Sequence, residues 1–177
     1  MDPFALLGIE PTFDLDLKSL SERHREISST LHPDRHVGSP SGERRAALDR
    51  AIQVNEAWRK LKAPLSRGEE LLRLMGVAMD EKNAPKADPE LLFQVMEARE
   101  ELAELRATPN TQSLQASIAK ATAWQRSLVN DLSQLFKGLQ ENARDPQGLL
   151  QVQSKLVELR YCERLLEEAH NLEHDAP

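Results

Sequence analysis

The sequence predicts an all-α protein, and three observations lead to that prediction. No segment shows the alternating polar and apolar pattern of a β-strand. Aromatic residues make up only 4% of the chain, whereas β-sandwiches and barrels depend on aromatic and β-branched strands. The 10 prolines are separated by long proline-free windows in which apolar residues recur every three or four positions, as they do in amphipathic helices. With 177 residues, 40% of them hydrophobic, we expect one or two small domains with packed cores.

The first 76 residues predict a helical hairpin flanked by short helices. The apolar stripe of the first long helix consists of Leu17, Leu20, Ile27 and Leu31. Asp14 and Asp16 are the candidate N-caps of this helix. The stripe of the second is Ala47, Ala51, Val54, Trp58 and Leu61. Pro64 suits the first turn of a short helix that would end near Gly76. Residues 77–89 contain two prolines among charged and small residues, and they predict a linker.

Residues 90–177 predict a three-helix bundle with turns at Pro109 and Pro146. The first predicted core stripe is Leu91, Val95, Ala98, Leu102 and Leu105. The second is Leu114, Ile118, Ala121, Leu128, Leu132, Leu135 and Leu139. The third is Leu149, Val152, Leu156, Leu159 and Leu166. Spacings of three and four place each stripe on one side of its helix.

Charge and cysteine content exclude several classes of protein. Residues 1–77 carry 12 basic and 12 acidic side chains, while residues 78–177 carry 11 and 17, so the net charge of −6 belongs to the second part. An acidic chain is a poor candidate for binding nucleic acid or an anionic membrane. The lone Cys162 excludes an internal disulfide, a thiolate zinc site and a cysteine-ligated cluster. We therefore expect no metal and no cofactor.

The N-terminal residues show no targeting signal. They lack the basic and long apolar regions of a signal peptide and the Arg-rich composition of a transit peptide. No stretch of about 18 apolar residues is present to span a membrane. We expect a cytoplasmic protein.

A His32-Pro33-Asp34 tripeptide followed by Arg35 separates the two long helices of the first domain. Proline ends the preceding helix and presets its own φ, and aspartate can accept hydrogen bonds from nearby backbone amides. The tripeptide is therefore expected at an exposed and well-ordered loop tip, which suits recognition by another protein.

The order of motifs in residues 1–76 resembles a J-domain, the DnaJ-type module that activates DnaK-type ATPase chaperones. The motifs are Phe4-x-x-Leu7-Gly8-Ile9, His32-Pro33-Asp34 and Asn55-Glu56-Ala57-Trp58-x-x-Leu61. The resemblance implies that the chaperone contacts this loop and basic residues of the helix before it, which here are His32, Pro33, Asp34, Arg35, Arg23 and Arg25. His24 stands where the family usually has an aromatic ring, and Leu31 replaces a usual Tyr. Both Arg23 and Arg25 can equally belong to a solvated helix face.

The helix predicted after the linker has a second face that combines apolar and acidic residues. Opposite the core stripe, helical geometry places Leu92, Phe93, Met96, Glu97, Glu100 and Glu104. Arg99 is the one base in residues 90–104. Such a face fits a partner with an apolar spot and a basic rim. On the last helix, Tyr161 lies about 200° around from Leu159, so it is either an off-core recognition residue or a ring lying flat on the bundle.

Over nearly its whole length, the chain resembles the HscB family of J-proteins that serve iron–sulfur cluster assembly. Further matching motifs are Pro64-Leu65-x-Arg67-Gly68-Glu69-x-Leu71-Leu72 and Arg99-Glu100-Glu101-Leu102. The resemblance implies a bundle that binds an IscU-type scaffold protein and a J-domain that engages an HscA-type, DnaK-like chaperone. The family's scaffold-binding positions correspond to Leu92, Phe93, Met96, Glu97, Glu100, Glu104 and Tyr161. The N-terminal cysteine tetrad and targeting peptide of eukaryotic members are missing, which favours a bacterial form.

Three alternatives remain open from the sequence. A general J-domain co-chaperone would act on unrelated unfolded clients. A helical adaptor with an accidental His-Pro-Asp tripeptide would act on no chaperone ATPase. His170 and His174 have a spacing that can bind metal, but no suitable third ligand is evident. No glycine-rich phosphate loop, nucleophile elbow or catalytic carboxylate pair is present, so we expect no catalytic site.

Overall fold

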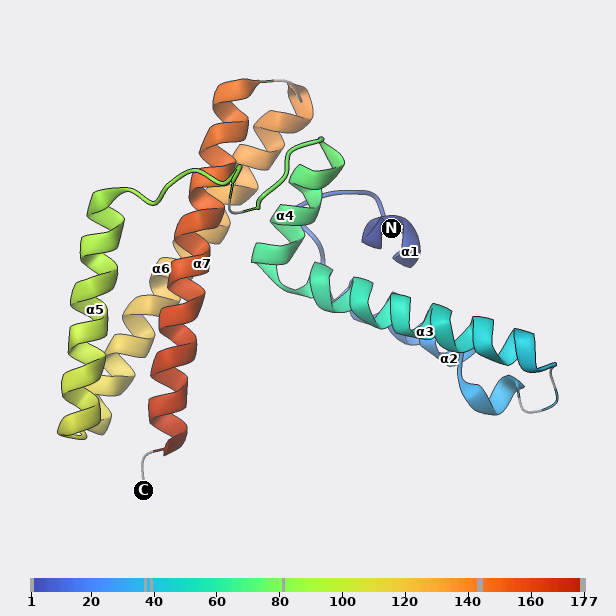
Figure 1. Ribbon diagram of the computed structural model, residues 1–177, viewed down its shortest axis with the longest axis horizontal. Helices are drawn as coiled ribbons and strands as arrows, with labels where there is room; N and C mark the ends of the chain where they lie inside the picture. The colour runs from blue at the N-terminus through green and yellow to red at the C-terminus, as the bar shows by residue number, and fades with distance from the viewer. Residues whose placement is uncertain (1, 37, 39, 81, 143–144, 176–177) are drawn as a thin grey trace. The chain divides into compact units, whose positions relative to one another are not determined.

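The computed structural model describes residues 2–36, 38, 40–80, 82–142 and 145–175. These residues form seven α-helices and one 3₁₀ helix, and they include no β-strand (Figure 1). The chain divides into two compact units, Met1–Val77 and Ala78–Pro177, each with buried residues of its own. The prediction of an all-α fold is therefore confirmed.

Helix α1 (Pro3–Leu7) is short and is stabilised at both ends. Oδ1 of Asp2 accepts a hydrogen bond from the Phe4 amide at 2.9 Å, and Phe4 and Leu7 are completely buried. Gly8 ends the helix with a φ of 63°, in the left-handed region that side chains disfavour. A Cβ at Gly8 would also lie 3.1 Å from Nη2 of Arg23, so the end of that side chain would have to shift slightly.

Helices α2 (Leu17–Thr30) and α3 (Ser41–Lys62) pack against each other as the predicted hairpin (Figure 1). Of the two candidate N-caps, Asp16 is the one used, because its carboxylate accepts hydrogen bonds from the amides of Lys18 and Ser19. The buried residues of the hairpin are Leu20, Val54, Ala57 and Leu61. Most of the predicted stripe is thereby buried or half-buried.

Leu17 departs from the prediction, since 47% of its surface is exposed. Leu17 is the first residue of α2 and directly follows the cap Asp16. It therefore starts the helix one turn before Leu20, which is the first α2 residue to reach the core. Helical spacing alone places Leu17 on the stripe but does not show where along the helix the packing begins.

Helix α4 (Pro64–Leu74) contains the motif from Pro64 to Leu72, whose side chains attach this helix to α3. Pro64 occupies the first turn, as predicted, and the buried Arg67 donates through Nη1 to the carbonyl of Leu61 at 2.9 Å. Ser66 Oγ donates to the carbonyl of Lys60 at 2.7 Å, so α4 satisfies carbonyls that the end of α3 leaves without helical partners. The Arg67 guanidinium also lies over the Phe13 ring at 4.9 Å. The motif therefore joins α4 to α3 and to the first core.

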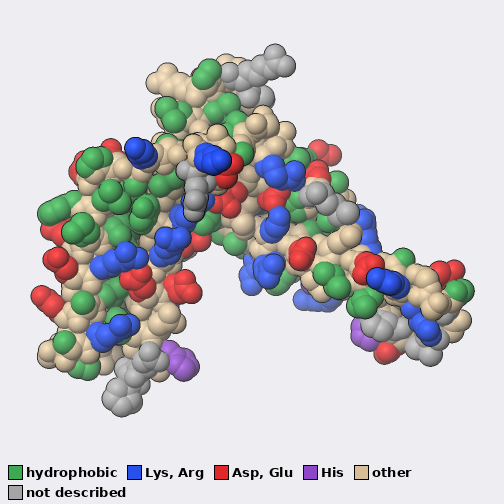
Figure 2. Space-filling view, in the orientation of Figure 1, with side chains coloured by type: hydrophobic (Ala, Val, Ile, Leu, Met, Phe, Trp, Pro, Cys, Tyr) green, Lys and Arg blue, Asp and Glu red, His purple; other side chains and the backbone are tan. Residues whose placement is uncertain are grey.

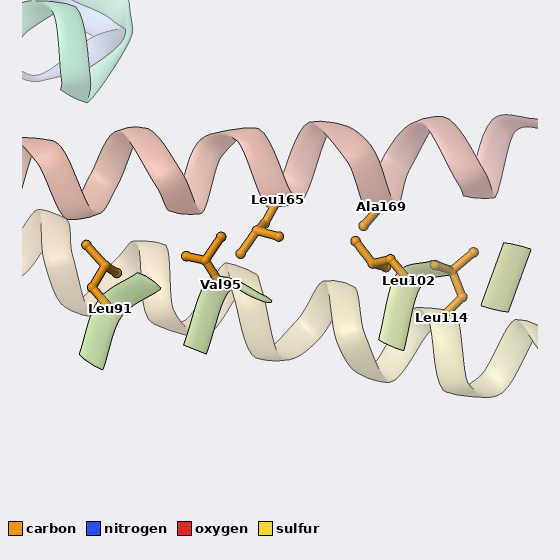
Figure 3. Close-up of a cluster of buried hydrophobic side chains, with 6 residues drawn as sticks. All are labelled: Leu91, Val95, Leu102, Leu114, Leu165 and Ala169. Carbon is orange, nitrogen blue, oxygen red and sulfur yellow. The ribbon is translucent and has the colours of Figure 1, made fainter. Parts of the chain in front are cut away.

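The second unit consists of α5 (Pro89–Ala107), α6 (Thr111–Glu141) and α7 (Pro146–Asp175). Asp88 caps α5 and Asn110 caps α6 through side-chain hydrogen bonds to backbone amides. The longest pairing is between α6 and α7, and α5 packs against both (Figure 1). Figure 3 shows where α5 joins them, in a cluster formed by Leu91, Val95, Leu102, Leu114, Leu165 and Ala169.

The segment before α5 packs on the second unit, although the sequence predicts a linker at residues 77–89. Ala87 packs against the cluster of Figure 3, and Nε2 of Gln153 on α7 donates to the carbonyl of Asn83 at 3.4 Å. From Ala78 onwards this segment therefore belongs to the second unit.

Candidate functional site

The His-Pro-Asp tripeptide forms a tight turn directly after α2. Leu31 closes α2, and Pro33–His36 form the 3₁₀ helix η1, which packs against α3. The side chains of His32 and Asp34 are 60% and 85% exposed. The turn therefore presents both side chains to solvent, as the sequence predicts for a recognition site.

Hydrogen bonds and an ion pair join His32 to Asp34 and Arg35 within this turn. Among the described residues, the Asp34 carboxylate faces the His32 ring, with Oδ2 3.4 Å from Nδ1. The Asp34 amide lies 3.3 Å from the same nitrogen, and the Arg35 amide donates to the His32 carbonyl at 3.0 Å. A neutral ring can accept from the amide, whereas a protonated ring pairs with the carboxylate. His32 thus maintains the turn, and the carboxylate keeps most of its surface free for a partner.

The predicted basic residues are not equivalent in the structure. Nε of Arg23 donates to the carbonyl of Leu7 at 3.3 Å, and its Nη1 lies 3.5 Å from Glu26, so Arg23 connects α2 to the end of α1. Arg25 and Arg35 are exposed, and neither side chain has a partner among the described residues. The side chain of Pro33, which was also predicted to bind the chaperone, lies outside what the structure describes. Of the three predicted arginines, Arg25 and Arg35 are therefore the two with no partner among the described residues, while Arg23 is paired but still about half exposed.

The ring of His24 on α2 stacks on the ring of Trp58 on α3. The two ring centroids lie 4.9 Å apart, and the rings are nearly parallel at 25°. Nε2 of His24 also lies 2.8 Å from Oδ1 of Asn55. His24 therefore contributes two contacts between α2 and α3.

The predicted second face of α5 is exposed. We call it the α5 ridge, and it consists of Leu92, Phe93, Met96, Glu97, Glu100 and Glu104. The exposed fractions of its apolar residues are 40% for Leu92, 61% for Phe93 and 60% for Met96, and its three glutamates are exposed as well. Figure 2 shows acidic side chains beside hydrophobic ones along the α5 edge of the second unit. Large apolar side chains left in solvent next to acidic groups are typical of a protein-binding surface.

Arg99 does not dilute the negative charge of the α5 ridge. It points toward α7, where its Nη2 and Nε donate to the two carboxylate oxygens of Glu168 at 2.6 and 3.2 Å. This two-point contact fastens α5 to α7. The sequence shows the basic residue but does not show that its charge is already paired.

Tyr161 was expected to be either an off-core recognition residue or a ring lying on the bundle, and the structure supports the second of these. The ring is half-buried and packs against the cluster that joins α5 to α7. The physical reason is that α7 contacts both other helices, so it has two buried faces. Leu156 and Leu159 belong to its main stripe, whereas Tyr161 accompanies Leu165 and Ala169 toward α5.

The helical period predicts only a core stripe on α6, but side chains of that helix also line a surface hollow. Lys120 and the half-buried Trp124 line it together with residues of α5. The sequence does contain a signal for this hollow. Ser117 and Ala121 are small and lie four positions apart, so they share one side of α6 and leave space beside it.

Cys162 is completely buried, and its Sγ donates to the carbonyl of Ala121 at 3.4 Å. Burial, reinforced by the negative charge of Glu163, raises the pKa of the thiol to about 12. A thiolate is the reactive form, so the native protein is expected to react very slowly with Ellman's reagent at pH 8, while the unfolded chain in guanidinium reacts at once. Fast reaction of the native protein at the rate of free cysteine would contradict this burial.

Metal binding by the late histidines finds no support in the described residues. Nowhere among them are three or more His, Cys, Asp or Glu side chains grouped as a metal ion requires. Nδ1 of His170 lies 2.7 Å from the carbonyl of Leu166, within its own helix.

Comparisons with known proteins find relatives over nearly the whole length of this chain. The family model described as the HSCB C-terminal oligomerisation domain matches residues 87–170. A co-chaperone protein HscB homolog from Aeromonas hydrophila is 32% identical over 98% of this chain and 96% of its own length. The chain belongs to the HscB family of co-chaperones. Another HscB homolog, from Shewanella halifaxensis, is 29% identical over 98% of this chain and 97% of its own length.

Solved structures of the family have the same fold. Chaperone HscB from Vibrio cholerae superposes with a TM-score of 0.82, at 30% identity over 98% of both chains. The human co-chaperone protein HscB gives a TM-score of 0.83 at 24% identity, over 97% of this chain and 81% of its own. Membership in a co-chaperone family implies a chaperone as partner. None of the helices in the described parts of the chain has both the length and the apolar character that a membrane span needs.

Proposed function

We propose that the protein binds an IscU-type scaffold protein, delivers it to an HscA-type, DnaK-like chaperone in the cytoplasm, and stimulates the ATPase of that chaperone during iron–sulfur cluster assembly. The observation that supports this most is the presence of two exposed surfaces of different character in one HscB-family chain. The exposed turn of His32 and Asp34, together with the exposed Arg25 and Arg35, is the surface for the chaperone. The α5 ridge is the surface for the scaffold.

The mechanism follows from covalent linkage of the two surfaces. When the turn of the first unit binds the chaperone, a scaffold bound to the α5 ridge is brought to the chaperone with it. This raises the effective concentration of scaffold at the chaperone, even when each contact is weak by itself. The protein supplies recognition in this scheme, and the ATPase supplies the catalytic chemistry.

A steady-state ATPase assay of a DnaK-like chaperone tests the proposal. We expect the protein to raise the rate, and the protein together with an IscU-type scaffold to raise it more than either does separately. Equal stimulation with any unfolded polypeptide in place of the scaffold would favour a general J-domain co-chaperone. Absence of any stimulation would refute the proposal.

A further inference from the structure

The surface hollow between α5 and α6 has a volume of about 610 Å³. Its apolar wall includes Leu102, Trp124 and Leu165, one residue from each helix of the bundle. Its charged lining consists of Glu97 and Glu101 on α5 and Lys120 on α6. A hollow of this size with an apolar floor and a polar rim can hold a large side chain of a partner protein.

The hollow stays open because the residues along this junction are small. Ala98 on α5 faces Ser117 and Ala121 on α6, and none of the three can fill the space between the helices. Meanwhile Arg99 and Glu168 hold α5 against α7, on the other side of α5. Across the junction, Ser117 Oγ donates to Oε1 of Glu101 at 3.0 Å.

A second hollow of about 550 Å³ follows along the same junction, past this hydrogen bond. It is lined by Glu101, Glu104 and Leu105 of α5 and by residues around the start of α6. We call the two hollows together the α5–α6 seam. The seam follows α5 from Gln94 to Ala107, and at the rise of an α-helix per residue this stretch is about 20 Å long. Its charged lining is three glutamates against a single lysine, so the seam is acidic.

We propose that the α5–α6 seam binds a basic amphipathic segment of the same scaffold protein that docks on the α5 ridge. This inference rests on the proposed function. The two surfaces are continuous, because Glu97 and Glu104 belong to the ridge and also line the seam. The three glutamates select a basic segment, and its apolar side chains enter the hollows beside Trp124 and Leu105.

Charge argues against a second copy of this chain as the occupant. The second unit, residues 78–177, carries 11 basic and 17 acidic side chains, so two such units repel each other. A basic segment of a client protein has the complementary charge.

Charge reversals of opposite sign test the inference in titrations with an IscU-type scaffold at about 0.15 M salt, where charges further apart than about 8 Å are largely screened. Lys120→Glu is expected to tighten binding by about threefold, and Glu101→Lys to weaken it by about tenfold. Arg126→Glu on α6 and Glu167→Lys on α7 are matched controls, because both side chains are exposed and neither lines the seam. Both controls are expected to bind with a Kd within about twofold of wild type.

Ala121→Leu places a larger side chain in the floor of the first hollow and is expected to weaken scaffold binding. Circular dichroism is expected to show an unchanged helix content.

The results separate this inference from the proposed function. If Phe93→Ala weakens binding while the seam variants behave as their controls do, the scaffold docks on the ridge alone and the seam inference is wrong. If the unchanged protein does not bind the scaffold, both fail. Opposite effects of Lys120→Glu and Glu101→Lys, with neutral controls, support the seam as part of the interface.

Discussion

Asp34→Asn is expected to abolish stimulation of the chaperone ATPase while leaving the fold and scaffold binding intact. The carboxylate is 85% exposed, and within the described residues its side chain faces only His32. An isosteric change at such a surface position typically alters the free energy of unfolding by no more than about 0.5 kcal/mol. In a complex, however, loss of a carboxylate that pairs with a cation of the partner costs about 2–5 kcal/mol, which lowers affinity at least about thirtyfold.

Asp49→Asn is the matched control for this prediction. It makes the same chemical change on the same unit, at an exposed position of α3 outside the His-Pro-Asp tripeptide. ATPase rates at saturating ATP and thermal melts of both variants are the measurements. Full stimulation by Asp34→Asn would show that the turn is not the chaperone contact, and an equal loss in Asp49→Asn would point to a general charge effect.

The double variant Leu92→Ala with Phe93→Ala is expected to weaken scaffold binding by at least about tenfold without loss of helix. The two side chains are 40% and 61% exposed, so truncating them opens no cavity in the core. In a complex they are the large apolar groups at one end of the α5 ridge, and burying such groups typically dominates the free energy of binding. Isothermal titration with the scaffold measures the loss.

Leu150→Ala provides the comparison for the double variant. Leu150 lies on α7 and is 53% exposed, so its truncation also removes exposed apolar surface from the same unit, away from the α5 ridge. We expect it to bind the scaffold as the unchanged protein does. Loss of helix in the double variant, seen by circular dichroism, would instead show that the ridge side chains support the bundle, and unchanged binding would remove the ridge from the interface.

Local signals in the sequence were sufficient to locate the helices. Pro64 and Gly76 correctly mark the beginning and end of α4, and Asp16 was one of two candidate caps for α2. The division of α5 into a buried stripe and an exposed ridge also followed from spacing alone, as the burial of Leu91 and the exposure of Phe93 confirm. These features depend on residues close together in the chain, so a single sequence contains the necessary information.

Features that depend on a neighbouring element were not predictable in the same way. Spacing assigned Leu17 to the core, but the other side of the hairpin does not cover it. Two placements of Tyr161 stayed open because one stripe was expected on α7, where the structure has two buried faces. Nor does the sequence show that Arg23 donates through Nε to the carbonyl of Leu7.

The sequence by itself therefore determined the all-α class, the helix boundaries, the position of the His-Pro-Asp turn and the two faces of α5. Only the tertiary structure decided which of the exposed charges are already paired, as for Arg99 with Glu168, and where space remains between helices, as at the α5–α6 seam. The reason is that the helical period identifies the buried side of one helix, whereas pairing and open space depend on the side chains of two helices that are distant in the chain.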